Sequence, residues 1–148
     1  QAMAVVPEDF EVPFGKCRVR REGSDLTIIT YGNTVHHCLE AADQVASEDG
    51  VQVEVVDLRS LSPLDEEGIL ASVAKTNRCL VVHEDKVFGG FGGEVASIIT
   101  EKGFELLDAP VKRIGSTFTP VGFNRILERE ILPNTQKVVT AIRELLAY

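Results

Sequence analysis

The chain has 148 residues, of which 44% are hydrophobic and 26% charged, as expected for one soluble globular domain with a substantial core. The formal net charge of −8 disfavours nucleic acid as a partner, because acidic surfaces repel phosphate backbones; it suits a basic protein partner, or serves solubility alone. No apolar run approaches the ~20 residues that cross a bilayer, and no charged-then-apolar leader is present, so we expect neither membrane insertion nor secretion.

The three cysteines, Cys17, Cys38 and Cys79, are widely spaced and form no Cys-x-x-Cys pair. An odd number of scattered cysteines indicates buried thiols in a reducing compartment and not a disulfide framework. We therefore expect a cytoplasmic protein, or a mitochondrial matrix protein in a eukaryote.

The first 16 residues show no periodic pattern, and two prolines and a glycine interrupt them. Gln1 and Ala2 precede the single methionine, Met3, as the remnant of a cleaved tag would. We expect a tag remnant and linker over residues 1–16 and one folded domain over residues 17–148.

The folded part begins with two strand patterns. Cys17–Arg21 alternates apolar and charged residues, as in an edge strand, whereas Leu26–Tyr31 is a continuous apolar run, as in a strand buried on both faces. A helix should follow, capped by Asn33 or Thr34 and ending near Asp49-Gly50. Its predicted buried stripe is Val35, Cys38, Leu39, Ala42, Val45 and Ala46.

The same order of elements then repeats. Val51–Asp57 predicts a second buried strand, and Asp65 predicts the N-cap of a helix that extends to about Thr76. Cys79–His83 predicts a third buried strand. The next helix should open at a glycine-rich turn, Gly89-Gly90-Phe91-Gly92-Gly93.

The last part of the chain predicts one more strand and two helices. Val111–Ile114 is the strand, Phe123–Glu130 is a short helix, and Asn134 is the N-cap of the final helix. Strands that alternate with helices predict an α/β fold with a parallel sheet and helices on both faces. The first strand has only a tight turn before the second, so it can lie antiparallel at an edge.

The glycine-rich turn lies between a strand and a helix, where phosphates often bind. The dinucleotide spacing G-x-G-x-x-G fails, because Val95 stands where the third glycine counted from Gly90 would be. A tight turn that allows close packing is one interpretation. The alternative is a small-anion, regulatory-ligand or interface site formed by Glu84, Gly89, Gly90, Gly92 and Gly93.

The remaining polar residues form no convincing catalytic set. His36 and His37 are adjacent on a helix and point in different directions, so they predict no metal site. His83-Glu84-Asp85 ends a buried strand, where a base or an interface is possible. No G-x-S-x-G nucleophile elbow occurs. We therefore expect no catalytic residue and no resident metal.

Seven segments of the chain resemble one known family, the transketolase C-terminal domain of β subunits of thiamine-diphosphate-dependent 2-oxoacid dehydrogenases. The most specific is the E-V-V-D-L-R-S-L-x-P-L-D block. The segments are Ser24–Gly32, Val35-His36, Val53–Asp65, Ser72–Arg78, Val81–Glu84, Gly89–Phe91 and Leu107–Val111. The pair His83-Glu84 before Gly89-Gly90-Phe91 is more similar to the branched-chain (2-oxoisovalerate) type than to the pyruvate type, and acetoin dehydrogenases are also similar.

The resemblance implies a three-layer α/β/α sandwich with a five-stranded, mostly parallel sheet and one antiparallel edge strand. It implies that thiamine diphosphate and magnesium bind to other domains of the parent enzyme, through a G-D-G motif that this chain lacks. The parent enzyme would decarboxylate a branched-chain 2-oxoacid or pyruvate and pass the acyl group to a lipoyl group. This domain alone would bind no cofactor and catalyse nothing.

The resemblance also implies the partners. They are the α subunit or region, a second β subunit, and the basic peripheral-subunit-binding domain of the acyltransferase component. Asp108 matches the acidic docking position, and the carboxylate of Tyr148 is a second docking candidate. A surface turn is the alternative role for Asp108. A ligand-binding domain of transketolase or deoxyxylulose-phosphate synthase is the alternative function of the chain.

Overall fold

The computed structural model describes residues 11–120 and 124–148. Five strands form one sheet in the order β1-β3-β2-β4-β5, in which β1 is antiparallel to β3 and all other neighbours are parallel. The strands are β1 (Arg18–Arg21), β2 (Leu26–Thr30), β3 (Val53–Asp57), β4 (Cys79–Lys86) and β5 (Lys112–Ser116). The helices are α1 (Thr34–Asp49), α2 (Glu66–Thr76), α3 (Phe91–Gly103), the 3-10 turn η1 (Phe104–Leu106), α4 (Arg125–Ile131) and α5 (Thr135–Leu146).

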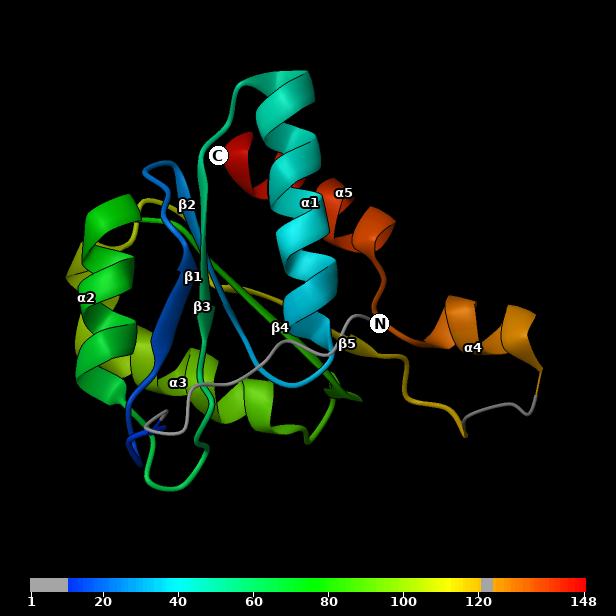
Figure 1. The fold of residues 1–148 in the computed structure, drawn as a ribbon, viewed down its shortest axis with the longest axis horizontal. Helices are drawn as coiled ribbons and strands as arrows, with labels where there is room; N and C mark the ends of the chain where they lie inside the picture. The colour runs from blue at the N-terminus through cyan, green and yellow to red at the C-terminus, as the bar shows by residue number, and fades with distance from the viewer. Residues whose placement is uncertain (1–10, 121–123) are drawn as a thin grey trace.

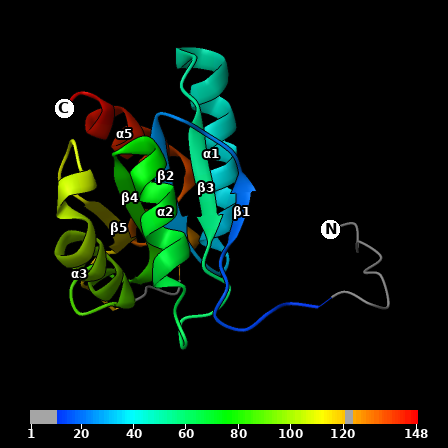
Figure 2. The same cartoon turned by 90° about the vertical axis from the view of Figure 1, so that its left-hand side faces the viewer.

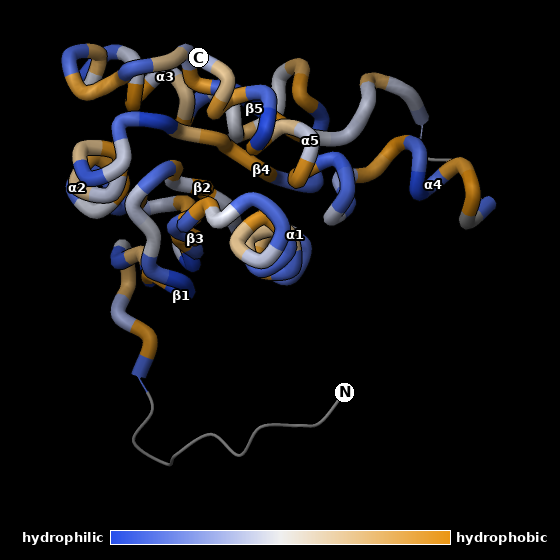
Figure 3. The backbone as a smooth tube through the Cα atoms, turned by 90° about the horizontal axis from the view of Figure 1, so that it is seen from above, coloured by the Kyte–Doolittle hydropathy of each residue, from blue (hydrophilic) through white to orange (hydrophobic). Residues whose placement is uncertain are grey.

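The helices cover both faces of the sheet (Figures 1 and 2). One core lies between the sheet and the pair α1 and α5, and a second lies between the sheet and the pair α2 and α3. Helix α4 stands outside these layers (Figures 1 and 3). The predicted three-layer α/β/α sandwich with a mostly parallel, five-stranded sheet is confirmed. In the described ranges no helix is long and apolar enough to span a bilayer.

Strand β1 pairs with β3 and not with β2, the strand that follows it directly. The turn between β1 and β2 passes the start of β3. There the N–H groups of Ser24 and Asp25 both donate to the carbonyl of Gln52, each at 3.0 Å. Figure 3 shows β1 as hydrophilic, in contrast to the hydrophobic first part of the inner strand β4. Charged side chains on an edge strand discourage pairing with another chain.

Two predicted helix caps are confirmed. The Asp65 carboxylate accepts the Gly68 N–H at 3.2 Å, and the Asn134 side chain accepts the Lys137 N–H at 3.0 Å. Asn33 occupies the predicted N-cap position of α1, but its side chain makes no capping hydrogen bond there. Thr34 donates its hydroxyl to the Tyr31 carbonyl at 2.7 Å, so the hydroxyl ties α1 back to the end of β2.

Several predicted boundaries need correction. Strand β4 continues three residues past His83, because its end pairs with Ser116 after a break in register. The continuation is polar, so an apolar pattern cannot reveal it. Strands β3 and β5 each begin later than predicted, at Val53 and Lys112. The predicted start of the short helix at Phe123 and the predicted tag remnant lie outside the described residues.

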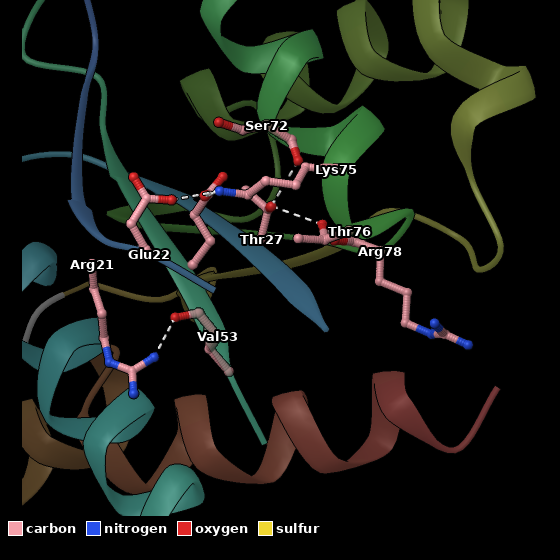
Figure 4. A network of polar contacts seen from close by, with 9 residues as sticks. Arg21, Glu22, Thr27, Val53, Ser72, Lys75, Thr76 and Arg78 are labelled. Atoms are coloured by element: carbon pink, nitrogen blue, oxygen red, sulfur yellow. Dashed lines mark hydrogen bonds and ion pairs between the residues drawn. The ribbon is translucent and has the colours of Figure 1, made fainter. Parts of the chain in front are cut away.

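A buried ionic contact connects helix α2 to strand β3. Glu54 is fully buried in β3, and the Lys75 ammonium of α2 contacts its Oε2. The same ammonium lies 2.6 Å from Oε2 of the exposed Glu22 (Figure 4). Beside it, the Thr27 hydroxyl contacts the Ser72 carbonyl at 3.0 Å and the Thr76 hydroxyl at 2.8 Å. Because an uncompensated buried carboxylate is costly, Lys75 holds α2 against the sheet.

Candidate functional site

The residues predicted to carry function lie at opposite edges of the sheet. In a parallel sheet all carboxyl ends of strands share one edge, here called the carboxyl edge. The glycine-rich turn follows β4 and lies at the carboxyl edge. Asp108 precedes β5, and its N–H donates to the Asn77 carbonyl just before β4, at 2.8 Å, so it lies at the amino edge. Asp108 and the glycine-rich turn therefore lie at opposite ends of the strands, although one groove along α3 is lined by both Asp108 and Gly93.

At the carboxyl edge, glycines surround the buried ring of His83. A Cβ on Gly92 would lie 2.1 Å from Nε2 of His83, and a Cβ on Gly90 would lie 3.1 Å from its Cε1. A Cβ on Gly115 of β5 would lie 3.0 Å from the same ring atom. The Tyr31 ring stacks on His83 with centroids 6.2 Å apart. The glycine-rich turn therefore allows the first turn of α3 to pack directly on His83.

His83 is fully buried, and neither ring nitrogen has a hydrogen-bond partner among residues 11–120 and 124–148. Burial lowers the pKa of His83 below its usual 6.5. The negative charge of Asp85 opposes this shift in pKa, and the positive charge of Arg113 adds to it. The folded domain therefore holds a neutral imidazole under the start of α3.

This burial predicts a pH-dependent stability. Between the lowered folded pKa of His83 and its unfolded pKa of about 6.5, the unfolded chain binds a proton that the folded chain excludes. The free energy of unfolding should therefore fall as the pH drops through about 6.5. Urea unfolding of wild type and His83→Met at several pH values measures this. The variant should lose part of the pH dependence below pH ~7, and identical pH profiles for the two proteins would contradict the expectation.

The other residues of the predicted anion or interface site are less closely connected. Glu84 is exposed, and its carbonyl accepts a hydrogen bond from the Ser116 hydroxyl. Gly89 adopts a positive φ of 76°, which explains the glycine there, and nothing lies within 4 Å of where its Cβ would be. A carboxylate oxygen of Asp85 lies 3.0 Å from the position of a Cβ on Gly90. Negative charge of the protein itself thus lies near the start of α3, where an anion would bind.

At the amino edge, Asp108 lines a groove of about 920 Å³ between α3 and the approach to β5. Its side chain is 63% exposed, and its nearest cation is Arg78, with Nη1 at 4.0 Å from Oδ2. The groove is lined by small and apolar residues (Gly93, Ala96, Leu107, Ala109, Pro110 and Val111) together with Phe104 and with polar or charged residues, namely Ser97, Thr100, Glu101 and Arg113. Asp108 therefore presents an accessible carboxylate at the border of this groove.

Tyr148 lies beside the same surface. Its exposed ring lines a smaller hollow of about 260 Å³, which shares Pro110 and Val111 with the larger groove. Helix α5 delivers the chain end to the turn before β5 (Figure 2). The two predicted docking residues, 40 positions apart in sequence, therefore border one continuous surface.

The remaining candidates show no reactive or metal-binding arrangement. Burial raises the pKa of Cys38 and Cys79 to about 12, and that of Cys17 to about 11. His37, and not His36, approaches Glu40, and its Nδ1 lies 3.2 Å from the Thr135 hydroxyl. Within the part of the chain that the structure describes, no three His, Cys, Asp or Glu residues are grouped to hold a metal ion.

Arg113, Phe88 and Phe118 lie at the carboxyl edge and are not among the residues predicted from the sequence. Arg113 crosses from β5 to the turn after β4, where its Nη1 donates to the Val87 carbonyl at 3.1 Å. Phe88 and Phe118 form an exposed edge-to-face pair with ring centroids 5.3 Å apart. Each phenylalanine follows the end of a strand by two residues, and this position is a signal that the sequence alone contains.

Comparisons with known proteins agree with this geometry. A family model described as "Transketolase, C-terminal domain" matches residues 15–138. A solved structure of a split gene transketolase, described as an inactive beta4 tetramer, superimposes with a TM-score of 0.81 at 30% identity, over 98% of this chain and 46% of that chain.

The curated relatives are β subunits. The chain is 46% identical to the acetoin:2,6-dichlorophenolindophenol oxidoreductase subunit beta of Bacillus subtilis, over 95% of this chain and 41% of the relative. It is 42% identical to the 2-oxoisovalerate dehydrogenase subunit beta of B. subtilis, over 95% and 43%. It is 40% identical to the pyruvate dehydrogenase E1 component subunit beta of Rickettsia felis, over 97% and 44%. The chain thus spans less than half the length of these relatives.

Proposed function

The chain belongs to the transketolase C-terminal domain family, and from this premise we propose that it is the assembly and docking domain of a thiamine-diphosphate-dependent 2-oxoacid dehydrogenase β subunit. The supporting observation is the amino-edge surface, where an exposed Asp108 borders the groove along α3 next to Tyr148. The proposed occupant is the basic peripheral-subunit-binding domain of the acyltransferase component. The net charge of −8 favours such a partner.

In this proposal the domain does not catalyse the reaction. The parent enzyme would decarboxylate a 2-oxoacid and transfer the acyl group to a lipoyl group, with chemistry supplied by thiamine diphosphate. The described residues of this domain do not fit the magnesium of that cofactor, because they include no group of three suitable ligands. The cofactor would be held by other parts of the parent enzyme, together with the α subunit or region and a second β subunit.

The proposed substrate of the parent enzyme is a 2-oxoacid, and the branched-chain type is not singled out. The branched-chain prediction depended on His83-Glu84 and Gly89-Gly90-Phe91, but identity to the acetoin-type relative (46%) exceeds identity to the 2-oxoisovalerate type (42%). His83 and the glycines pack against one another, so packing explains these residues without a role in substrate selection. We propose a reducing compartment, the cytoplasm or the mitochondrial matrix, since relatives of the pyruvate type include mitochondrial proteins.

The docking proposal is tested by titrating the domain with the subunit-binding domain at low and high salt. Asp108→Ala should weaken binding about tenfold at low salt, because a charge at the border of the groove is removed. Glu84→Ala removes the same charge from the opposite edge and should leave the affinity unchanged. Equal weakening by both variants would indicate an effect of net charge only, and unchanged binding by Asp108→Ala would refute this role.

A second candidate function is anion or regulator binding at the start of α3. The unpartnered, buried His83 beneath this turn favours it, whereas the nearby Asp85 carboxylate opposes it. Titration with inorganic phosphate, followed by amide NMR shifts at Gly92 and Gly93, distinguishes the two functions. Saturable shifts there, with no effect of the subunit-binding domain, would favour the second candidate.

A further inference from the structure

Three exposed phenylalanines lie along the carboxyl edge. Phe14 precedes β1, which starts at this edge because it runs antiparallel, and it is 90% exposed. Phe88 and Phe118 follow β4 and β5 and are 75% and 73% exposed. The Phe88–Phe118 pair is here called the carboxyl-edge aromatic surface; Phe14 lies at the same edge, on the other side of β3 and β2. Large aromatic side chains bury 150–250 Å² each when covered, so an exposed group of them marks an interaction site.

Hydrogen bonds hold the Phe88–Phe118 pair in place. The Val87 N–H donates to the Ser116 carbonyl at 3.1 Å, and the Lys86 ammonium contacts the carbonyls of Thr117, at 3.2 Å, and Thr119. The loops after β4 and β5 are therefore connected just before Phe88 and on either side of Phe118. A surface fixed before binding loses little conformational entropy when a partner covers it.

The linker leaves the domain at this same edge. The Cys17 N–H donates to Asp65 at 3.0 Å, and a Cβ on Gly15 would lie 2.9 Å from the Pro63 ring. Phe14 borders a small hollow with Arg59 and Ser60, which follow β3. Figure 2 shows the segment before β1 at the end of the sheet where the turn before α2 also lies. The described part of the linker before β1, from residue 11, therefore lies at the carboxyl edge.

We infer that the carboxyl-edge aromatic surface is the face on which the preceding domain of a longer β chain packs. The matched family is a C-terminal domain, and this chain spans only 41–44% of three of its curated relatives, so more than half of each relative's length lies outside the match. The inference rests on the proposed function in one respect, namely that the domain works within such a longer chain. It leaves the amino edge, with Asp108, free for an external partner.

Hydrogen exchange provides the test. Amides of residues 86–90 and 117–119 should exchange at least tenfold more slowly in the longer polypeptide than in the 148-residue chain. The double variant Phe88→Ser/Phe118→Ser should remove this protection in the longer polypeptide. Phe104→Ser is the matched control, because Phe104 is also 73% exposed but lies at the far end of α3, and it should leave the protection intact.

Three outcomes would overturn the inference. The first is equal exchange of these amides in both chains, and the second is loss of protection by Phe104→Ser as well. The third is concentration-dependent protection in the 148-residue chain alone that the double variant removes, which would make a second copy the occupant. Binding of the subunit-binding domain is measured on the same double variant and should be unchanged, so failure of this inference is distinguishable from failure of docking through Asp108.

Discussion

Replacing Lys75 with methionine is expected to reduce the free energy of unfolding by about 2–4 kcal/mol, because the fully buried carboxylate of Glu54 then loses the cation that contacts it. Breaking a fully buried ion pair costs about 3–5 kcal/mol, and the partial exposure of Lys75 to solvent places this pair at the lower part of that range. Methionine keeps the apolar stem that packs along α2, so the loss reports the charge. Urea unfolding monitored by circular dichroism measures the change.

Two further variants separate the buried contact from the exposed one. Glu22→Gln removes only the exposed partner of Lys75 and should change stability little. The double variant Lys75→Met/Glu54→Met replaces the pair by apolar side chains and should recover most of the lost stability, because no buried charge remains. A double variant as unstable as Lys75→Met alone would show that the contact acts through packing and not through charge.

Replacing Gly92 with alanine is expected to destabilise the domain by about 3 kcal/mol, because the new methyl group would overlap the buried His83 ring. The Cβ would lie 2.1 Å from Nε2 and 2.2 Å from Cδ2. The ring has little room to move away, since the backbones of Gly90 and Gly115 lie so near that a Cβ on either would come within about 3.1 Å of its Cε1, and Tyr31 stacks on it. The gain in helix propensity, about 1 kcal/mol, offsets only part of this cost.

Gly93→Ala is the matched control for this overlap, one position further along the same helix. Its Cβ would lie 3.1 Å from Nη1 of Arg113, the mobile end of an exposed side chain, so we expect no loss and up to about 1 kcal/mol of gain. Adding Gly92→Ala to His83→Ala should cost much less than adding it to wild type, since the overlapping ring is then absent. Chemical denaturation of wild type, Gly92→Ala, His83→Ala and the double variant measures this coupling. Additive losses of stability would contradict it.

Local sequence patterns alone predicted the order of the strands and helices and the α/β fold class. Continuous apolar runs, such as Leu26–Thr30, place strands in the buried centre of a sheet, and side-chain oxygens at Asp65 and Asn134 mark helix starts. These signals are local, since periodicity and capping depend on residues a few positions apart. The motif resemblance implied the same number of strands and added Asp108 as the predicted docking residue.

The contacts between distant residues became known from the tertiary structure alone. Strand order places β3 between β1 and β2, and no local pattern in β1 specifies that neighbour. Glu54 stands in an apolar strand without a visible partner until α2 brings Lys75 to it from 21 positions away. The packing of His83 under Gly92 and the shared surface of Asp108 and Tyr148 both depend on contacts between distant segments. Such contacts are set by the packing of helices on the sheet, which residue periodicity does not encode.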